Sequence, residues 1–524
     1  MVASSQPLAT AAGLRALRAG GNAADAAVAT AAALNVTEPN MTGIGGDCFA
    51  LYYDAETRAV SALNGSGRAP AGLSIDLLRR EGLGDELPRF HAHTVTVPGA
   101  CAGWCDLLER HGSLPRQEVL APAIELAEGG FPVAPITAFL WKLGAETQLC
   151  RSPGGRELTI DGRAPQAGEL FRNPTLAGTL RRVADKGAEA FYTGEVAGAI
   201  AAVVQEHGGV LTEQDLAEHR SSWEEPIFAD YGGLRVWECP PNGQGLTALL
   251  ALGILRGLDL VGQDPLSAGR LHLLIETMRL AFADARRHIA DPTFAAIPLD
   301  ELLSEDYAAQ RRAEIRPDRA NPDPRFGRPL ASSDTVYMCA VDGRGNGCSF
   351  INSNYMAFGT GLVPPGFGFT LQNRGHSFSL DPDHANALEP RKRPYHTIIP
   401  GLLTRTSDGS LYGPFGVMGG FMQPQGHVQV VVGMTDDGLD PQAALDRPRF
   451  HLVGGAPRGA VALELGVPEE TVAELARRGH DVSIAEGWGR VQFGRGQIIR
   501  RDASGVLWGG SDPRADGCAG TLVE

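Results

Sequence analysis

A sharp change of composition just ahead of Thr335 constrains this chain more than any other feature. Residues 317–334 read PDRANPDPRFGRPLASSD, a stretch rich in Pro, Asp and Arg with no apolar period, which is typical of a linker. Residues 336–341 (VYMCAV) and 348–354 (CSFINSN) are apolar runs of strand length, and the Gly-rich stretch DGRGNG separates them. The pattern predicts an antiparallel hairpin that begins immediately behind a loose, cuttable linker.

Antiparallel counting across this hairpin places two hydroxyl groups close together. If Asp342 and Gly347 close a four-residue loop, Thr335 lies opposite Asn354, with Ser353 beside it. The register of this pairing could differ by one or two residues. A threonine hydroxyl is a weak nucleophile unless a base is adjacent. Cleavage before Thr335 would free its α-amino group, whose pKa of about 8 suits that task. The alternative is that Thr335 simply begins a strand.

Composition limits the size, partners and location of the protein. The 524 residues are enough for one large α/β domain or two. Because the net charge is −15, with 43 Arg but only three Lys, we expect no nucleic-acid partner. No apolar run reaches the roughly 18 residues of a membrane span, so we expect no membrane association. Residues 1–14 carry no Lys or Arg, which favours a cytoplasmic location, or a periplasmic one if a leader was trimmed.

We expect no cofactor, no metal and no disulfide. The eight cysteines are scattered and are interpreted as free thiols; no zinc motif is present. The glycines at 43–46 lack the spacing of a dinucleotide or phosphate loop, which favours a tight turn with close backbone packing. His427 either lines a pocket or is a core histidine, and the core interpretation is favoured. No Gly-x-Ser-x-Gly elbow surrounds Ser66, because Asn64 precedes it.

Apolar spacing and capping residues predict an α+β chain, with strands early and late and helices between them. Asn22 is expected to cap an Ala-rich helix, and residues 335–524 are expected to be mostly short strands with one late helix. Helices are expected at 7–18, 23–34, 246–255, 267–290 and 469–479, and early strands at 48–53 and 59–64.

A series of short motifs resembles the γ-glutamyltransferase (γ-glutamyltranspeptidase) family and follows that family's order across nearly the whole chain. They include 20–28 (GGNAADAAV), 43–46 (GIGG), 97–99 (VPG), 240–245 (PPNGQG), 358–361 (FGTG), 392–394 (KRP), 419–420 (GG) and 511–514 (SDPR). The resemblance implies an N-terminal-nucleophile (Ntn) hydrolase with a four-layer αββα sandwich. It also implies a precursor that cuts itself between Asp334 and Thr335 into two entwined subunits, 1–334 and 335–524, with Thr335 as the nucleophile.

The resemblance also assigns roles to individual positions. Ser353 stands where the family has a Thr that hydrogen-bonds the nucleophile. Gly419 and Gly420 would offer backbone N–H groups to the oxyanion, and glycine lets the backbone approach the substrate closely. His396 and Thr397 occupy the place of the two serines that hold the substrate carboxylate.

Four departures from the family pattern point to a different acyl group. Ser66 replaces the Arg that grips the γ-glutamyl α-carboxylate, although Arg68 lies two residues on. Ser377 replaces the acidic partner of the substrate α-amino group, Arg374 replaces a Gln, and Tyr355 replaces an Asn. A pocket that loses a carboxylate and gains an arginine should prefer a plain carboxylate to an ammonium group. The alternative for Arg374 is a structural salt bridge to Asp381 or Asp383.

These departures resemble the branch that includes cephalosporin (glutaryl) acylases and oxamate amidohydrolase. The chain is therefore predicted to be a self-processing amidohydrolase or acyltransferase acting on small amides with a free carboxylate, of glutaryl, γ-glutamyl or oxamate type. One alternative is a true γ-glutamyltransferase acting on glutathione, and another is a non-catalytic scaffold. The sequence leaves open the donor, the acceptor and whether the processed heterodimer forms a homo-oligomer.

Overall fold

The computed structural model describes residues 1–84, 86–321 and 334–522. Most of the expected linker, residues 322–333, lies outside this described part, whereas Thr335 lies within it. No helix in the described part is long and apolar enough to cross a bilayer.

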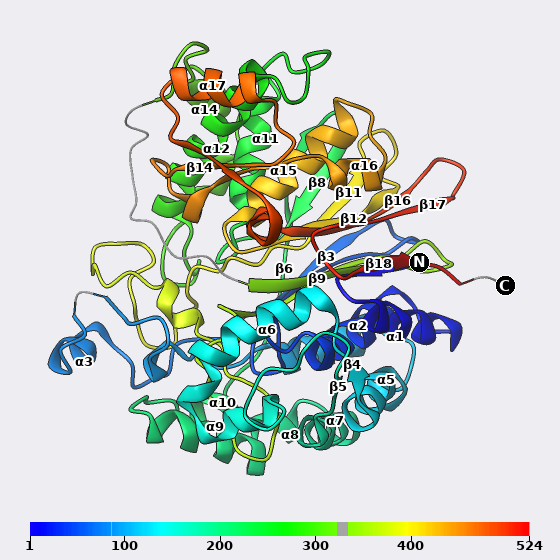
Figure 1. Cartoon of the computed structure of the whole chain (residues 1–524), viewed down its shortest axis with the longest axis vertical. Helices are drawn as coiled ribbons and strands as arrows, with labels where there is room; N and C mark the ends of the chain where they lie inside the picture. The colour runs from blue at the N-terminus through cyan, green and yellow to red at the C-terminus, as the bar shows by residue number, and fades with distance from the viewer. Residues whose placement is uncertain (85, 322–333, 523–524) are drawn as a thin grey trace.

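Two antiparallel sheets form the centre of the molecule (Figure 1). The seven-stranded sheet has the order β18-β1-β9-β10-β2-β3-β6. Its strands are β1 (Val2–Ser4), β2 (Asp47–Tyr53), β3 (Val60–Gly65), β6 (Ser222–Glu224), β9 (Asp334–Val341), β10 (Gly347–Tyr355) and β18 (Cys518–Gly520). The six-stranded sheet has the order β17-β16-β12-β11-β8-β7. Its strands are β7 (Ile227–Tyr231), β8 (Leu234–Glu238), β11 (Gly401–Arg405), β12 (Leu411–Met418), β16 (Arg495–Arg501) and β17 (Leu507–Ser511).

Helices cover the outer face of each sheet, as Figure 1 shows. The layer on the seven-stranded sheet contains α1 (Pro7–Arg18), α2 (Ala23–Thr37), α4 (Ala100–His111), α5 (Arg116–Gly129), α6 (Pro135–Thr147), α7 (Pro174–Lys186), α8 (Glu189–Tyr192), α9 (Gly194–Glu206) and α10 (Glu213–Ala217). The layer on the six-stranded sheet contains α11 (Gly245–Leu255), α12 (Ala268–His288), α14 (Glu305–Arg312), α15 (Met422–Thr435), α16 (Pro441–Asp446) and α17 (Glu469–Arg477). Strands β9 and β12 pack against each other across the two sheets. The expected four-layer αββα sandwich is therefore confirmed.

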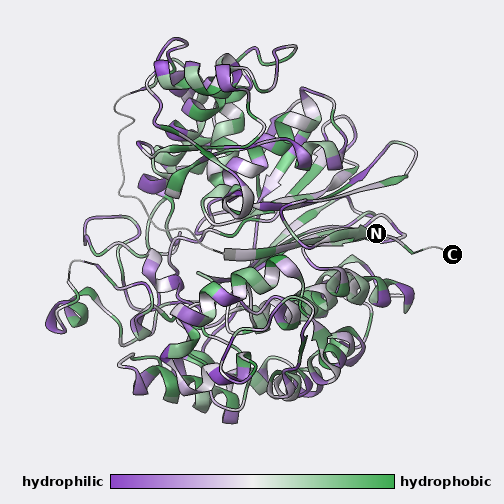
Figure 2. Ribbon diagram, viewed as in Figure 1, coloured by the Kyte–Doolittle hydropathy of each residue, from purple (hydrophilic) through white to green (hydrophobic). Residues whose placement is uncertain are grey.

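Smaller elements lie around this sandwich. They are α3 (Ile75–Arg80), α13 (Leu299–Leu302), the pair β4 (Phe131–Pro132) and β5 (Leu170–Phe171), and the sheet formed by β13 (Phe450–Leu452), β14 (Val461–Glu464) and β15 (Val482–Ala485). In Figure 2 the hydrophilic colour is concentrated at the outer ends of helices and in loops, whereas the strands at the centre are mostly hydrophobic.

Both sheets combine strands from either side of Thr335. In the seven-stranded sheet, β9 pairs with β1 and β10 pairs with β2, so the late hairpin is enclosed by early strands. In the six-stranded sheet, β11 pairs with the early strand β8. Since backbone hydrogen bonds join the two parts within each sheet, a cut before Thr335 would leave them interlocked.

The Ala-rich helix α2 shows how the sequence produces close packing. Asn22 caps it in a capping box with Asp25, as the sequence predicted for the cap. Every residue of α2 is buried, because the helix contacts α1 and α5 on one side and β9 and β10 on the other. Small alanine side chains allow helix and sheet to approach on all sides.

The hairpin forms as predicted, but its register differs by one residue from the count made on the sequence. Val341 pairs with Gly347 and Val336 with Asn352, and the pairing becomes irregular before Asp334 reaches Tyr355. The register set at Val341 and Gly347 brings Thr335 to Ser353, and the two side chains are hydrogen-bonded. Tyr355, at the end of the irregularity, has a φ of 78°, a left-handed conformation that costs a bulky residue energy and that tends to cluster at functional sites.

Candidate active site

Thr335 lies at the beginning of β9 and is completely buried. The Thr335 hydroxyl donates to Ser353 Oγ at 3.2 Å and accepts from Gln423 Nε2 at 3.4 Å. The nucleophile predicted from the sequence therefore has one acceptor and one donor in contact with its oxygen.

Ser353 is the centre of this hydrogen-bond network. Besides the Thr335 hydroxyl, its Oγ accepts from the Tyr355 backbone N–H at 2.9 Å and from Arg374 Nη2 at 3.2 Å. These donors hold the serine oxygen in a fixed position beside the nucleophile. The geometry agrees with the pairing of Ser353 and Thr335 expected from the resemblance.

Arg374 is a fully buried cation that makes no ion pair with any described residue. Its Nη1 donates to Thr397 Oγ1 at 2.6 Å, and its guanidinium carbon lies 4.2 Å from the centre of the Tyr355 ring. Burial lowers the pKa of Arg374 to about 10. The alternative of a salt bridge to Asp381 or Asp383 is wrong, because both aspartates are exposed and neither contacts Arg374.

His396 is held by a carboxylate that the sequence analysis did not single out. Its Nε2 lies 3.0 Å from Asp47 Oδ2, and its Nδ1 accepts from the Ile398 backbone N–H at 3.4 Å. Nε2 therefore carries the hydrogen and donates a hydrogen bond to Asp47 Oδ2. Burial lowers the pKa of His396 far below its usual value, and the nearby Arg374 adds to that effect. His396 is neutral and orients the backbone that carries Thr397.

Asp47 follows the Gly-rich turn at 43–46 and fixes several backbone segments. Its Oδ1 accepts from the backbone N–H groups of Gly67 and Gly99 and from Gln372 Nε2 at 2.9–3.1 Å. Burial raises the pKa of Asp47 to about 7, although these donors and Arg374 oppose the rise. The turn itself is packed too tightly for side chains: a Cβ on Gly46 would lie 2.3 Å from the Ser353 carbonyl oxygen. The interpretation of this turn as close backbone packing is confirmed.

Gly419 and Gly420 form the turn between β12 and α15, with φ values of 134° and 59°. Within the described residues no hydrogen bond engages the N–H of either glycine, so both donors are available to an oxyanion. Gln244 Nε2 fixes the turn by donating to the Gly420 carbonyl at 2.8 Å and to the Thr397 carbonyl at 2.5 Å. One glutamine from the early part of the chain thus joins two segments of the late part.

Within the described residues, no hydrogen bond joins the remaining expected site residues directly to Thr335. Ser66 is buried and donates to Asn64 Oδ1 at 2.6 Å. Ser377 ends the short 3-10 turn that Arg374 begins. Arg68 is partly exposed and donates to the Arg220 carbonyl, and no hydrogen bond among the described residues joins it to Thr335.

Three functional candidates were missed from the sequence, and each follows a motif glycine closely. Asp47 comes directly after Gly46, Gln244 lies inside the PPNGQG segment, and Gln423 lies three residues after Gly420. A polar residue next to a motif glycine is the signal that could have found them. Where glycine lets backbone segments pack closely, a neighbouring polar side chain is shielded from solvent and needs a hydrogen-bond partner within the protein.

His427 belongs to the core, as favoured from the sequence. Its Nδ1 lies 2.7 Å from Glu238 Oε1, and both side chains are fully buried. Burial raises the pKa of Glu238, and the contact with His427 opposes this rise. The pair joins α15 to β8.

The core position of His427 gives a testable expectation. His427→Phe fills the space but leaves Glu238 without its hydrogen-bond partner, so the free energy of unfolding should fall by about 2 kcal/mol. Denaturant unfolding measures this change, and Glu238→Gln, which keeps the shape, is the matched control. Turnover by the folded variant should stay within about twofold of the wild type. A large loss of turnover with unchanged stability would instead place His427 in the pocket.

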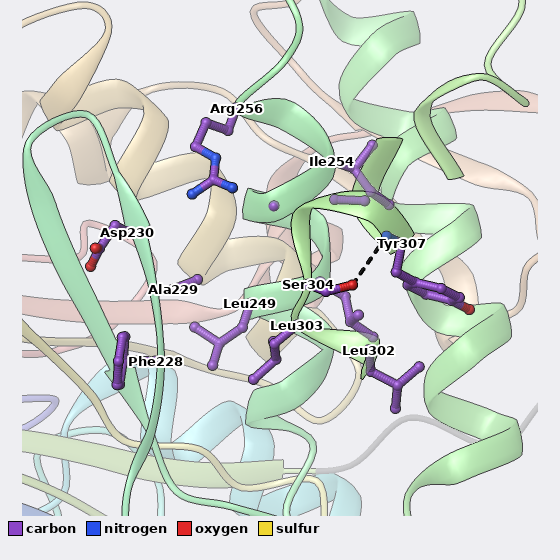
Figure 3. A pocket seen from close by; sticks show the side chains of 13 residues that line it. Phe228, Ala229, Asp230, Leu249, Ile254, Arg256, Leu302, Leu303, Ser304 and Tyr307 are labelled. Carbon is purple, nitrogen blue, oxygen red and sulfur yellow. Dashed lines mark hydrogen bonds between the residues drawn. The ribbon is translucent and has the colours of Figure 1, made fainter. Parts of the chain in front are cut away.

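A cavity of about 150 Å³ lies away from this network, between β7, α11 and the segment that joins α13 to α14 (Figure 3). Phe228, Leu249 and Leu302 line its apolar part, and Ser304 accepts the Tyr307 backbone N–H at 3.2 Å beside it. None of the residues around Thr335 lines this cavity. In the described part of the chain, no group of His, Cys, Asp or Glu residues is arranged to hold a metal ion.

Comparison with known proteins agrees with this geometry. The family model described as gamma-glutamyltranspeptidase matches residues 9–522. The glutathione hydrolase-like YwrD proenzyme of Bacillus subtilis (strain 168) is 38% identical, over 99% of this chain and 98% of that protein. The oxamate amidohydrolase proenzyme of Klebsiella pneumoniae is 34% identical, over 98% and 96%. The crystal structure of a cephalosporin acylase from Bacillus halodurans has a TM-score of 0.93 and 47% identity, covering 100% of this chain and 96% of that one.

Proposed function

Because this chain belongs to the γ-glutamyltranspeptidase family, we propose that it is a self-processing amidohydrolase that cleaves small amides carrying a free carboxylate. It is an enzyme with the Ntn-hydrolase fold, and relatives above 30% identity are called proenzymes. Cleavage between Asp334 and Thr335 would give subunits 1–334 and 335–524. The pairing of early and late strands in both sheets supports a stable heterodimer after that cut.

In the first reaction, Thr335 would act on its own chain. Its Oγ attacks the carbonyl carbon of Asp334, the Asp334–Thr335 amide bond breaks, and the nitrogen takes up a proton. Water then hydrolyses the resulting ester, which releases a carboxylate on Asp334 and a free α-amino group on Thr335.

In the second reaction, the freed α-amino group would accept the hydroxyl proton as Thr335 attacks the substrate amide. The N–H groups of Gly419 and Gly420 would stabilise the oxyanion, and each such donor contributes roughly 3 kcal/mol. The leaving amine departs with a proton, and water hydrolyses the acyl-enzyme. An amine in place of water would give acyl transfer.

The observation that supports a carboxylate-bearing acyl group is that the buried Arg374 makes no ion pair with any described carboxylate, although Asp47 acts on it from a greater distance. A fully buried guanidinium is normally paired, because removing a charge from water is costly. Among the residues that the structure describes, Arg374 instead touches neutral oxygens and an aromatic ring. A substrate carboxylate bound beside Thr397 would supply the missing anion, held by the guanidinium fork. Among the described residues of this network, no carboxylate contacts Arg374. This part of the network therefore offers no partner for a substrate ammonium group.

A panel of donors tests this proposal and separates it from the alternative. Purified, processed protein is assayed with glutaryl-p-nitroanilide, oxamate, γ-glutamyl-p-nitroanilide and acetyl-p-nitroanilide. The proposal expects turnover of the glutaryl amide or of oxamate, and little of the acetyl amide, which has no carboxylate. Strong turnover of the γ-glutamyl amide alone would favour a true γ-glutamyltransferase acting on glutathione and would contradict the assignment of Arg374.

A further inference from the structure

Gln423 lies at the start of α15 with its side chain fully buried and directed at the nucleophile. Its Oε1 accepts from the Ile399 backbone N–H at 2.9 Å. Because a backbone N–H can only donate, this contact determines which end of the amide is the oxygen. The Nε2 end therefore faces Thr335 Oγ1, at 3.4 Å.

Two other glutamines of the same helix make the same kind of contact with backbone only. Gln425 donates to the carbonyls of Phe421 and Leu452 and accepts from the Leu452 N–H. Gln429 donates to the carbonyls of Gln425 and Phe450 and accepts from the Phe450 N–H. Their contacts fasten α15 to β13 without approaching Thr335. Of these three glutamines, Gln423 alone has a reacting oxygen as its partner.

We infer that Gln423 is a catalytic residue that donates a hydrogen bond to Thr335 Oγ while this oxygen loses its proton and attacks. In the resting state the Thr335 hydroxyl donates a hydrogen bond to Ser353. A lone pair of Thr335 Oγ is therefore left for the Gln423 amide. As the O–H bond breaks, negative charge grows on Oγ and the donor stabilises it. The new Oγ–C bond forms to the Asp334 carbonyl in self-cleavage and to the substrate carbonyl in turnover. Gln423 keeps its own proton throughout.

The inference rests on the proposed function, since it assumes that Thr335 is the attacking group. It adds a side-chain donor at the nucleophile itself, distinct from the backbone donors of Gly419 and Gly420 at the oxyanion. It also predicts that self-cleavage and turnover slow together, because the same oxygen attacks in both reactions.

Three variants test this role by the rate at which freshly synthesised precursor divides into two fragments, followed by mass spectrometry. Gln423→Met has a similar length but no donor, and self-cleavage should slow roughly 10- to 100-fold, the effect of one hydrogen bond to a charged oxygen. Gln429→Met removes the same amide from the same helix without touching Thr335, and it should process at the wild-type rate. Thermal unfolding of each precursor checks that the fold is retained.

Gln423→Glu tests the hydrogen bond to Thr335 separately from the hydrogen bond that Gln423 accepts from Ile399. A carboxyl group can still accept the Ile399 N–H, but only its protonated form can donate to Thr335. Self-cleavage should therefore be lost as pH rises and this carboxyl ionises, a loss that the wild type does not show over the same range. The KM of the processed wild type and Gln423→Met enzymes should agree within about threefold, while kcat falls in the variant.

Each outcome decides for or against the role. Wild-type rates in Gln423→Met would overturn it, as would a Gln423→Glu protein that processes at the wild-type rate at alkaline pH, because Gln423 would then serve only to hold Ile399. An equal loss in Gln429→Met would show that the effect comes from the stability of α15. Failure of the wild type itself to divide before Thr335 would instead contradict the proposed function.

Discussion

Thr335→Ala is expected to give a single folded chain of 55.3 kDa that neither divides nor hydrolyses amides. The change removes the only oxygen that the mechanism uses for attack, so both rates should fall by roughly 10⁴-fold or more. The fold should survive, because the substitution removes only the hydrogen bonds that the Thr335 hydroxyl makes with Ser353 and Gln423, each worth about 1 kcal/mol. Mass spectrometry after long incubation and an amide assay measure the two rates.

Thr335→Ser is the matched control, since it restores the attacking oxygen and the future amine. We expect it to process, at a reduced rate, because the threonine methyl group no longer restricts rotation of the hydroxyl. Cleavage of Thr335→Ala at the same bond would show that another group or a protease cuts the chain. A wild-type protein that stays intact and inactive would favour a non-catalytic scaffold.

Arg374→Gln is expected to have the second largest effect, and one that depends on the substrate. With the guanidinium removed, the carboxylate of a glutaryl donor is desolvated without a partner, so kcat/KM for glutaryl-p-nitroanilide should fall by about 10²-fold or more. The selectivity for glutaryl over acetyl amide should largely disappear. Steady-state kinetics with both donors measure this change.

Arg374 also contacts Ser353 and Thr397, so a control must separate substrate binding from support of the nucleophile. Arg374→Lys keeps the positive charge but loses the fork, and it should retain part of the preference for the glutaryl donor. The rate of self-cleavage, which involves no external carboxylate, reports on the nucleophile alone. An equal loss for acetyl and glutaryl amides, matched by slower self-cleavage, would show that Arg374 only positions Ser353.

Local signals in the sequence correctly located the hairpin that carries Thr335 and Ser353, and the start of one helix packed against it. The turn DGRGNG between apolar runs predicted the hairpin of β9 and β10, and Asn22 predicted the start of α2. Helix α15 was not predicted, because residues 335–524 were expected to be mostly strands. Nearly all of its residues are buried, and its Val-rich segment at 430–432 has no polar face. A helix buried on all sides loses the amphipathic period by which helices are recognised.

The register of the hairpin could only be predicted to within a residue or two. Counting from an assumed four-residue loop placed Thr335 opposite Asn354, whereas the structure pairs Val341 with Gly347, and this register brings Thr335 to Ser353. The irregularity between Asn352 and Tyr355 comes after this one-residue difference, beside the turn whose Gly46 packs against the Ser353 carbonyl. The apolar runs and the Gly-rich stretch mark the hairpin, but they do not say how many residues the loop takes, and the loop sets the register of every pair.

The sequence by itself determined where a linker meets a strand, which threonine follows the linker, and which short motifs resemble an enzyme family. Those features depend on neighbouring residues and can be read locally. Only the tertiary structure decided that Asp47 orients His396, that Gln423 faces Thr335, and that no described carboxylate makes an ion pair with Arg374. These contacts join residues up to 349 positions apart, and they exist because strands and helices from both parts of the chain pack into one core. Whether a buried charge is paired depends on everything packed around it.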